Sequence, residues 1–303
     1  RRTNDVYELR IVGVDGSAER MLWQAEKGWA AWEAQWFPDG KRIMVSVWIA
    51  EDRNRLVAIS ASDGAATTLW EGKHLRDPQL SPDGKSAVDT RRVREDPAAD
   101  ELWLLRFEDR SEALLFEGRS SVVSRLWTPD GAGVVFLSDR RAPGTTLDLW
   151  LLRTSGGKPV GFPELIKTGL GKMANGRPTV FSSGPITRDG TLYFQRRTDE
   201  RMLQLLTTKF DPDTGKVVGT PSFVARKGGA SNGAVFSRDG RWLSYQLRNG
   251  SIKSSVIQSV ESGEERVLPM TPSPVQIDWA WMFPDGRSFL VRFGAALGPF
   301  GSA

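Results

Sequence analysis

The residues Gly229-Ala230-Ser231-Asn232-Gly233 fit the pattern G-x-S-x-G, which holds the nucleophilic serine in many hydrolases. In those enzymes a buried strand precedes the serine and a helix follows it, so that the hydroxyl stands on a sharp turn. Here Arg226-Lys227-Gly228 precede the pattern and the strand-like run Ala234-Val235-Phe236 follows it. We therefore predict a loop between two repeats at this position and no catalytic serine.

Other reactive groups are scarce. The chain has one histidine and no cysteine, which excludes a histidine-based metal centre, disulfides and thiol chemistry. His74 is expected in a solvent-exposed loop. Asp211-Pro212-Asp213-Thr214-Gly215 resembles the start of a calcium loop, but no Glu stands at the twelfth position, so a hairpin turn is predicted. We predict no catalytic residue, no metal ligand and no cofactor.

Charge and hydropathy narrow the possible partners. The 41 Lys and Arg exceed the 37 Asp and Glu by only four, and the basic residues are dispersed, so a nucleic-acid partner is not expected. No apolar run approaches the roughly 20 residues of a membrane span, so direct membrane insertion is not expected. The chain begins at Arg1 rather than Met, which is typical of an excised domain or a processed product.

A turn of the type Pro-Asp-Gly or Arg-Asp-Gly recurs six times, each time between two apolar segments. The Asp positions differ by 44, 47, 59, 50 and 46 residues, and a period of about 40 to 50 residues is typical of four-stranded propeller blades. In a type I turn Pro fits the second position and Gly the fourth, and Arg is tolerated in place of Pro. The six turns are Phe37-Pro38-Asp39-Gly40, Ser81-Pro82-Asp83-Gly84, Thr128-Pro129-Asp130-Gly131, Thr187-Arg188-Asp189-Gly190, Ser237-Arg238-Asp239-Gly240 and Phe283-Pro284-Asp285-Gly286.

The sequence thus predicts an all-β, six-bladed β-propeller with four antiparallel strands per blade, in one domain of residues 1–303. Each turn joins the first two strands of a blade, and a second hairpin supplies the other two. The chain opens with a second hairpin that lacks a first and closes with a first hairpin that lacks a second, so we expect the N-terminal strands to complete the C-terminal blade and close the ring. The expected divisions are 30–70, 75–117, 121–165, 178–225 and 230–269 for blades 1 to 5, and 275–293 with 5–23 for blade 6.

In each repeat an apolar residue stands before the Pro-Asp-Gly or Arg-Asp-Gly turn and a second apolar segment follows it. This pattern covers nearly the whole chain and resembles that of the TolB-type six-bladed propeller family of bacteria. The resemblance implies one of several settings, which include periplasmic components of envelope complexes, sensor-associated propellers and the gating propellers of prolyl-oligopeptidase-type enzymes. The preferred hypothesis is a non-catalytic binding or interaction propeller, sensory or scaffolding, of a periplasmic or other extracytoplasmic bacterial protein. A substrate-gating propeller of a serine peptidase and a channel-site enzyme, such as a lyase on acidic sugars, remain alternatives.

If the ring forms, the starts of the first strands of the blades build one mouth of the central channel. A protein partner or a small polar ligand is expected to bind there to a monomer. Solvated loops and aromatic packing are the alternative. Aligned on the turns, the candidate ligand-binding residues are Trp32, Glu33, Arg76, Asp77, Ser124, Ser183, Asn232, Asp278 and Trp279. A basic rim from the loops after the second strands would surround them, with Arg53, Arg91, Arg92, Arg140, Arg141, Arg196, Arg197, Arg248 and Arg292.

Two further features concern packing and the longest repeat. Trp36, Trp103, Trp127, Trp150 and Trp242 occupy matching positions and are expected in the core between sheets. Residues 156–185 lengthen the fourth spacing, and we expect a long loop there that flanks the mouth. The alternative is a surface elaboration that packs on the outer rim through Phe162, Leu165 and Ile166.

Overall fold

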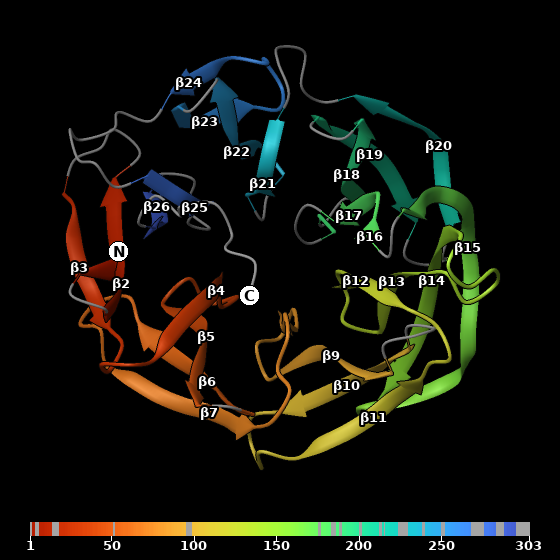
Figure 1. Ribbon diagram of the computed structural model, residues 1–303, viewed down its shortest axis with the longest axis horizontal. Coiled ribbons are helices and arrows are strands. Elements are labelled where there is room, and N and C mark those ends of the chain that lie inside the picture. Colours follow the sequence, from red (N-terminus) through yellow and green to blue (C-terminus); the bar gives the residue numbers. More distant parts are fainter. Residues whose placement is uncertain are drawn as a thin grey trace. The chain divides into compact units, whose positions relative to one another are not determined.

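The computed structural model describes the chain as β-strands joined by turns, without a helix in the described residues (Figure 1). These residues are 2–3, 6–13, 18–50, 52–94, 99–174, 177–182, 186–187, 190–199, 202–211, 214, 216–223, 230–237, 240–249, 252–267, 276–282 and 288–294. The chain divides into two compact units. Unit 1 comprises residues 1–51, 56–68 and 229–303, and unit 2 comprises residues 52–55 and 69–228.

Three sheets follow the chain order that the turn repeat predicts. The first contains β4 (Ala30–Trp36), β5 (Arg42–Ala50), β6 (Arg53–Ser60) and β7 (Ala66–Gly72). The second contains β8 (Gln79–Leu80), β9 (Ser86–Arg94), β10 (Ala99–Arg106) and β11 (Glu112–Glu117). The third contains β12 (Val122–Trp127), β13 (Gly133–Ser138), β14 (Thr146–Ser155), β15 (Lys158–Ala174) and the short β16 (Arg177–Pro178).

The two ends of the chain share another sheet, which lies in unit 1. It contains β1 (Arg2–Thr3), β2 (Val6–Gly13), β3 (Arg20–Gln24), β25 (Gln276–Met282) and β26 (Ser288–Gly294). β2 pairs antiparallel with β1, β3 and β26, and in the pairing with β26 Arg10 lies opposite Val291 and Ile11 opposite Leu290. The N-terminal hairpin therefore joins the C-terminal hairpin in one sheet, while closure of a complete ring stays a prediction.

The prediction of six separate blades is wrong, because the strands that the structure describes form five hydrogen-bonded sheets. The segments assigned to blades 4 and 5 fall in one eight-stranded sheet. Its strands are β17 (Val180–Ser182), β18 (Thr191–Asp199), β19 (Met202–Asp211), β20 (Lys216–Phe223), β21 (Ala230–Phe236), β22 (Trp242–Asn249), β23 (Ile252–Ser259) and β24 (Glu265–Val267). The turn repeat counts hairpins, whereas the number of sheets depends on which strand edges pair.

The repeated turns form as predicted wherever the structure describes them. The N–H of Gly84 donates to the carbonyl of Ser81 at 2.9 Å, and the N–H of Gly131 donates to that of Thr128 at 2.9 Å. Both glycines have positive φ, 72° and 73°, a conformation that other residues adopt at a cost. The Asp side chain braces the turn, because Oδ1 of Asp83 accepts hydrogen bonds from the Ser81 hydroxyl and the Lys85 N–H. The turn at 283–286 and the central residues 188–189 and 238–239 of two other turns lie outside the described residues.

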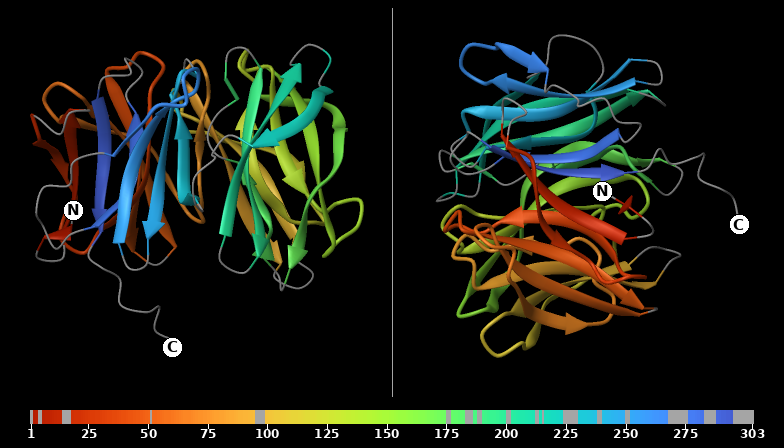
Figure 2. Two further views of the ribbon diagram at one scale, coloured as in Figure 1. Left: turned by 90° about the horizontal axis from the view of Figure 1, so that it is seen from above. Right: turned by 90° about the vertical axis from the view of Figure 1, so that its left-hand side faces the viewer.

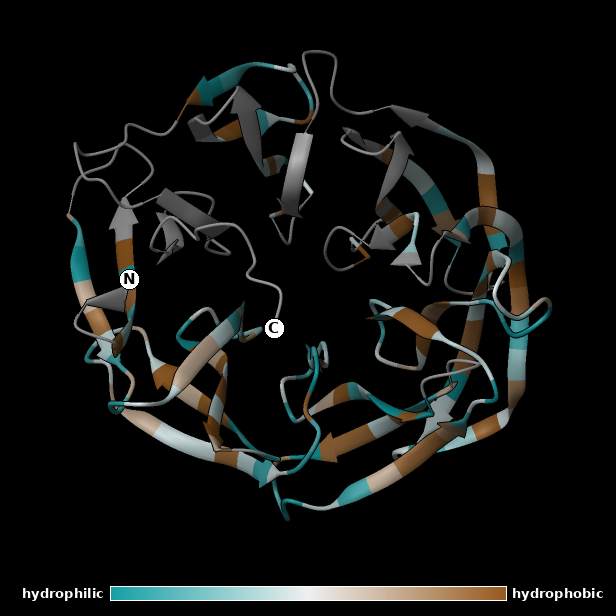
Figure 3. Cartoon of the chain, in the orientation of Figure 1, coloured by the Kyte–Doolittle hydropathy of each residue, from teal (hydrophilic) through white to brown (hydrophobic). Residues whose placement is uncertain are grey.

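Each unit has hydrophobic clusters of its own, formed by the apolar runs of the middle strands. Figure 3 shows brown bands on strands such as β5 and β10. In unit 1, Ile43 and Val47 of β5 are fully buried. In unit 2, one cluster centres on Leu102 and Val134, and another on Leu147 and Val180.

Of the tryptophans predicted for the core, Trp150 is buried, and Trp36, Trp103, Trp127 and Trp242 are half-buried. Among the tryptophans whose side chains the structure describes, Trp70 of β7 is the most deeply buried, and its burial was not predicted. Its indole N–H donates to Glu112 at 3.1 Å.

The prediction of a long loop at residues 156–185 is wrong for the described part of that segment. Residues 158–174 form β15, which pairs with β14 beside it (Figure 2), and the register shifts at three places along the pair. Bulges of this kind absorb extra residues without breaking the ladder, which is why the insertion extends a strand. Of the three anchors in the alternative interpretation, Phe162 and Leu165 are exposed, whereas Ile166 is partly buried and packs against a hydrophobic cluster of unit 2.

Candidate functional site

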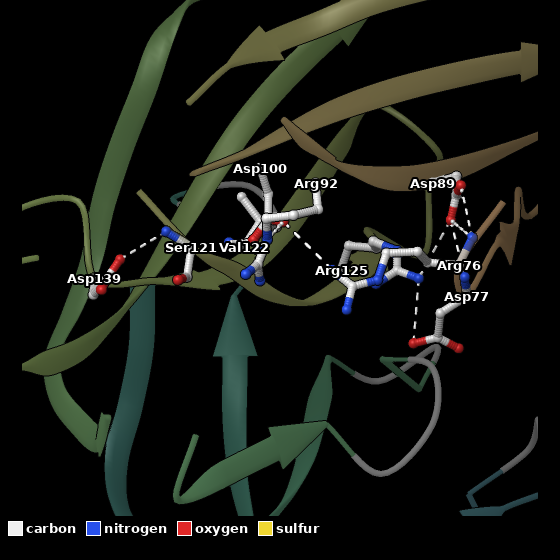
Figure 4. Close-up of polar contacts among 9 residues, drawn as sticks. All are labelled: Arg76, Asp77, Asp89, Arg92, Asp100, Ser121, Val122, Arg125 and Asp139. Atoms are coloured by element: carbon white, nitrogen blue, oxygen red, sulfur yellow. Dashed lines mark hydrogen bonds and ion pairs between the residues drawn. The ribbon is translucent and has the colours of Figure 1, made fainter. Parts of the chain in front are cut away.

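A group of charged side chains in unit 2 lies where β8 and β12 begin, and its anchor is Asp89 of β9. The backbone N–H groups of Arg76 and Asp77 donate to this carboxylate at 3.1 and 3.0 Å. The Asp89 side chain is only 1% exposed. Burial raises its pKa, although Arg125 and the N–H groups of Asp77 and Arg76 act in the opposite direction. Asp89 thus fixes the backbone that leads into β8 (Figure 4).

Arg125 of β12 connects the next strand to the same carboxylate. Its guanidinium is 2% exposed, and Nη2 lies 3.6 Å from Oδ1 of Asp89 and 3.2 Å from Oδ2 of Asp77. A buried arginine needs a compensating negative charge, and here two carboxylates from the preceding repeat supply it. The ion pairs therefore hold the starts of β8 and β12 together within unit 2.

Asp100 of β10 is the second buried carboxylate and is fully shielded from solvent. Its Oδ2 accepts the N–H of Val122 at 2.8 Å, and its Oδ1 accepts Nε of Arg92 at 2.6 Å. Nη1 of Arg76 lies 3.5 Å from the same carboxylate. Asp100 thus ties the first residue of β12 to the strands of the preceding sheet.

The start of β12 has a third carboxylate contact. Oδ1 of Asp139 accepts the N–H of Ser121 at 2.9 Å, and its Oδ2 accepts the N–H of Gly144. Ser124 is buried on β12, at the register shift between Val122 and Ser124. Carboxylates therefore accept N–H groups where β8 and β12 begin, and the local backbone is rigidly held.

Two of the predicted site residues remain accessible on this frame. The side chain of Arg76 is 51% exposed and that of Asp77 is 46% exposed, although their backbone groups are anchored to Asp89. The structure thus presents one positive and one negative group beside each other on a fixed backbone. Such an arrangement can bind a polar or charged partner without a large entropic cost.

Trp32 and Glu33 of the predicted site lie on β4 in unit 1. Both side chains are half-buried. Glu33 has φ of 45° at a β-bulge, since Trp32 pairs with Ser46 and Ala34 pairs with Val45 on β5. A positive φ is unusual for a residue other than glycine, and such strain is common at functional sites.

The remaining members of the predicted set are only partly described. Ser183 lies outside the described residues. Asn232 lies on β21, and Asp278 and Trp279 lie on β25, whereas the structure does not describe their side chains. Arg76 and Asp77 are therefore neighbours before β8, Ser124 lies on β12 next to Arg125, and Trp32 and Glu33 are neighbours in unit 1.

The arginines predicted for a basic rim are largely neutralised where the structure describes them. Arg53 pairs with Glu71, Arg91 with Glu112 and Arg92 with Asp100, and Arg141 pairs with Asp148. Arg140 stacks over the rings of Phe116 and Trp150, and burial lowers its pKa. These side chains serve the local architecture, so the rim carries less free charge than the sequence suggests.

The motifs with possible chemistry have structural roles in the described residues. Ser231 and Asn232 lie in strand β21, so the prediction of a loop at this position is wrong. The strand continues after Ser231, whereas a helix follows the serine of a nucleophile elbow. His74 lies in a loop with its side chain 62% exposed, as predicted. β19 and β20 form an antiparallel hairpin in which Asp211 lies opposite Lys216 in the strand register, which confirms the predicted hairpin.

The described residues contain no group of three or more His, Cys, Asp or Glu side chains placed to hold a metal ion. The same residues include no helix with the length and hydropathy of a membrane span.

Sequence reasoning missed Asp89, Asp100 and Arg125, which hold the site together. A signal existed, because each stands in or beside an apolar strand run: Ala87-Val88-Asp89, Asp100-Glu101-Leu102 and Arg125-Leu126-Trp127. Charged residues are seldom fully buried unless they are paired. Their partners, however, come from separate strands, which the local pattern does not identify.

The antiparallel sheets and the repeated turns define an all-β propeller, and comparison with solved structures agrees. TolB from Acinetobacter baumannii matches with a TM-score of 0.59 and 17% identity over 96% of this chain and 64% of that one. At this identity the likeness concerns the fold, which is therefore that of a TolB-type propeller.

Enzymes share the same architecture. An oligogalacturonate lyase in complex with manganese has a TM-score of 0.61 and 10% identity, covering 94% of this chain and 82% of the lyase. A prolyl endopeptidase has a TM-score of 0.54 and 14% identity, covering 86% of this chain and only 46% of the peptidase. No protein-family profile matches the sequence, and no curated protein matches it.

Proposed function

We propose that this chain is a non-catalytic binding propeller that recognises a protein or a small polar ligand at the starts of its first strands. The observation that carries the proposal is the pair Arg76 and Asp77. Both side chains are about half exposed, whereas the backbone beneath them is fixed by the buried Asp89.

The charges around Arg76 and Asp77 support a role of this pair in recognising a partner, in addition to its structural contacts. Asp89 pairs with Arg125, and Asp100 pairs with Arg92. Arg76 and Asp77 also contact this frame, at 3.5 Å from Asp100 and 3.2 Å from Arg125, yet about half of each side chain stays exposed. The accessible portions of Arg76 and Asp77 can therefore contact a partner while the frame stays in place. Opposite charges presented side by side favour a partner with a complementary pair and disfavour a reversed one.

The test is a comparison of two double variants by affinity purification and quantitative mass spectrometry. R76A/D77A removes the exposed pair, and R266A/E264A removes a matched pair, separated by 3.0 Å and 71% and 61% exposed. Partners that bind the wild type and the control but are lost with R76A/D77A, and that then bind as purified components, support the proposal. Partners retained equally by both variants contradict it.

Activity assays address the absence of catalysis directly. A fluorophosphonate probe is expected to leave Ser231 unlabelled, and incubation with oligogalacturonate is expected to give no unsaturated product. Stoichiometric labelling of Ser231, or turnover of the sugar, would show that the chain is an enzyme.

One observation favours a second candidate function, the gating propeller of a serine peptidase. The chain covers less than half of the prolyl endopeptidase to which it is similar, as expected if a catalytic domain lies elsewhere in a longer protein. Sequencing the gene on both sides of this segment separates the candidates. A downstream domain with G-x-S-x-G before a helix favours gating, whereas a membrane helix with a signalling domain favours the sensory or scaffolding function.

We also propose an extracytoplasmic, periplasmic location for a bacterial protein, from its likeness to TolB. Fusion to alkaline phosphatase within the full-length gene tests this, since the reporter is active only after export. Activity of a matched cytoplasmic reporter at the same position would contradict the proposed location.

A further inference from the structure

Exposed apolar side chains of unit 2 lie on three strands that adjoin one another. Figure 1 shows β15 between β11 and β20, and β15 contacts both of these strands. Phe162 of β15 is 87% exposed, and Val160 on the same strand is 52% exposed. The residues that we call the apolar strip are Leu114 of β11, Val160, Phe162 and Leu165 of β15, and Val218 of β20. Single exposed apolar residues are ordinary, whereas a group of them is typical of an interaction surface.

The apolar strip does not belong to the core of unit 2. Its sequence neighbours do, because Leu115 is buried in one hydrophobic cluster, and Ile166 and Val217 pack against another. Successive residues of a strand face opposite sides, so the strip faces away from these clusters. Burial in the folded chain therefore does not explain why these positions carry large apolar side chains.

The backbone of β15 decides how a partner can be held. Among the described strands, the second edge of β15 pairs only with β16, at Met173 and Ala174. Along the remaining edge Gly161 and Gly169 have φ of 70° and 69°, and Pro163 has no N–H to donate. Irregular backbone and proline are common protections against the addition of a foreign strand. A partner of this surface is therefore expected to be held by the side chains of the strip.

The charges on these strands are mainly positive. Lys158 and Lys172 of β15 and Lys216 of β20 are exposed, and none of them pairs with a described carboxylate. The acidic residue of β15, Glu164, is already paired with Arg153 at 3.3 Å. A basic surface favours a partner with carboxylates. It disfavours a symmetric contact with a second copy of this chain, because such a contact would bring lysines to lysines.

We propose that the apolar strip binds an extended segment of another protein in which apolar side chains alternate with Asp or Glu. Phe162 is the main anchor, since large aromatic side chains contribute much of the binding energy of interfaces and Phe162 lies between Val160 and Leu165 along β15. The lysines pair with the carboxylates of the bound segment. This inference goes beyond the proposed function, because it assigns a second partner surface that does not include Arg76 or Asp77.

Binding of the purified whole chain to three sets of synthetic peptides tests the proposal by fluorescence anisotropy. In the first set apolar residues alternate with Asp or Glu. The second set has Lys in place of the acidic residues, and the third has Ser in place of the apolar ones. Peptides of the first set are expected to bind at least about 10-fold more tightly than those of either other set, because both apolar burial and charge contribute. Added salt should weaken this binding, since the lysines are exposed.

Variants assign the binding to the strip. Phe162→Ser is expected to weaken binding of the acidic apolar peptides by about 10-fold or more, and K158E/K172E by about 5-fold or more. The matched controls are Val267→Ser, at a valine that is 61% exposed, and Lys27→Glu, at an exposed lysine, and both should leave binding unchanged. The replaced side chains are exposed, so the fold should persist, which circular dichroism checks.

Three outcomes overturn the proposal: no binding by the first set of peptides, equal binding by all three sets, or binding that Phe162→Ser and K158E/K172E leave unchanged. Two further results would assign the strip to a different occupant and overturn it as well. One is sedimentation with phosphatidylglycerol vesicles that Phe162→Ser abolishes, and the other is a dimer in analytical ultracentrifugation that the same variant dissociates. The R76A/D77A variant is expected to bind the peptides normally, so failure of the proposed function and failure of this inference give different results.

Discussion

Replacement of Asp100 tests whether buried charge holds the candidate site together. Asp100 is fully buried, accepts the N–H of Val122 at 2.8 Å and pairs with Arg92 at 2.6 Å. Removing one partner of a buried pair costs about 3–5 kcal/mol, and the Arg92 side chain, 26% exposed, recovers part of its solvation. Asp100→Ala is therefore expected to lower the free energy of unfolding by about 3 kcal/mol, and Asp100→Asn, which keeps an acceptor for Val122, by about 1–2 kcal/mol.

Urea denaturation followed by tryptophan fluorescence and circular dichroism measures these changes. Glu264→Ala is the control, because its pair with Arg266 is exposed and should contribute less than about 1 kcal/mol. A double-mutant cycle of Asp100→Ala with Arg92→Ala should give a coupling of about 1–2 kcal/mol. The reasoning is refuted if Asp100→Ala costs no more than Glu264→Ala or if the cycle gives no coupling.

Three further predictions concern backbone strain and pH. Gly64 and Gly263 both have positive φ, but a Cβ on Gly64 would collide with the Leu22 carbonyl, whereas a Cβ on Gly263 would meet nothing within 4 Å. Gly64→Ala should therefore lower the free energy of unfolding by about 1–3 kcal/mol more than Gly263→Ala, as measured by thermal or urea unfolding. Equal costs of the two substitutions would contradict the packing around Gly64. Glu33→Gly should leave the free energy of unfolding unchanged within about 1 kcal/mol, because relief of positive φ offsets the entropy of glycine, and a larger loss would assign Glu33 a structural role. Hydrogen bonds from Arg55 and Arg53 hold the pKa of Glu71 below its ordinary value of 4.5, so Glu71 stabilises the folded state above that value and loses this contribution as the pH falls through its folded pKa. The difference in unfolding free energy between wild type and Glu71→Gln, about 0.5–1 kcal/mol at pH 7 for this partly exposed group, should therefore vanish in acid, and a difference that persists there would contradict this assignment.

Much of the strand pattern could be predicted because its causes are local. The turn at Ser81-Pro82-Asp83-Gly84 closes through one hydrogen bond between residues three apart, and its glycine needs a positive φ. The same holds at Thr128-Pro129-Asp130-Gly131, and the apolar runs on either side become strands of one sheet. The pairing of β2 with β26 also followed from the pattern, because each end of the chain carries only half of a four-stranded unit.

The candidate site could be predicted in part. Alignment on the turns placed Arg76, Asp77 and Ser124 at the starts of neighbouring strands, where the structure finds them. The same alignment treated Arg91 and Arg92 as a free basic rim, whereas both pair with carboxylates. A linear pattern gives the position of a charge along its strand but not the charge that faces it from another strand.

The sequence by itself determined the hairpins, the repeat and the scarcity of reactive groups. Only the tertiary structure decided that Asp89, Asp100 and Arg125 are buried, because burial depends on strands far apart in the chain. It also decided that the strands form five sheets rather than six and that residues 158–174 extend a sheet. Edge pairing depends on which strands meet in the folded chain, and the interactions within a single turn or hairpin do not specify that.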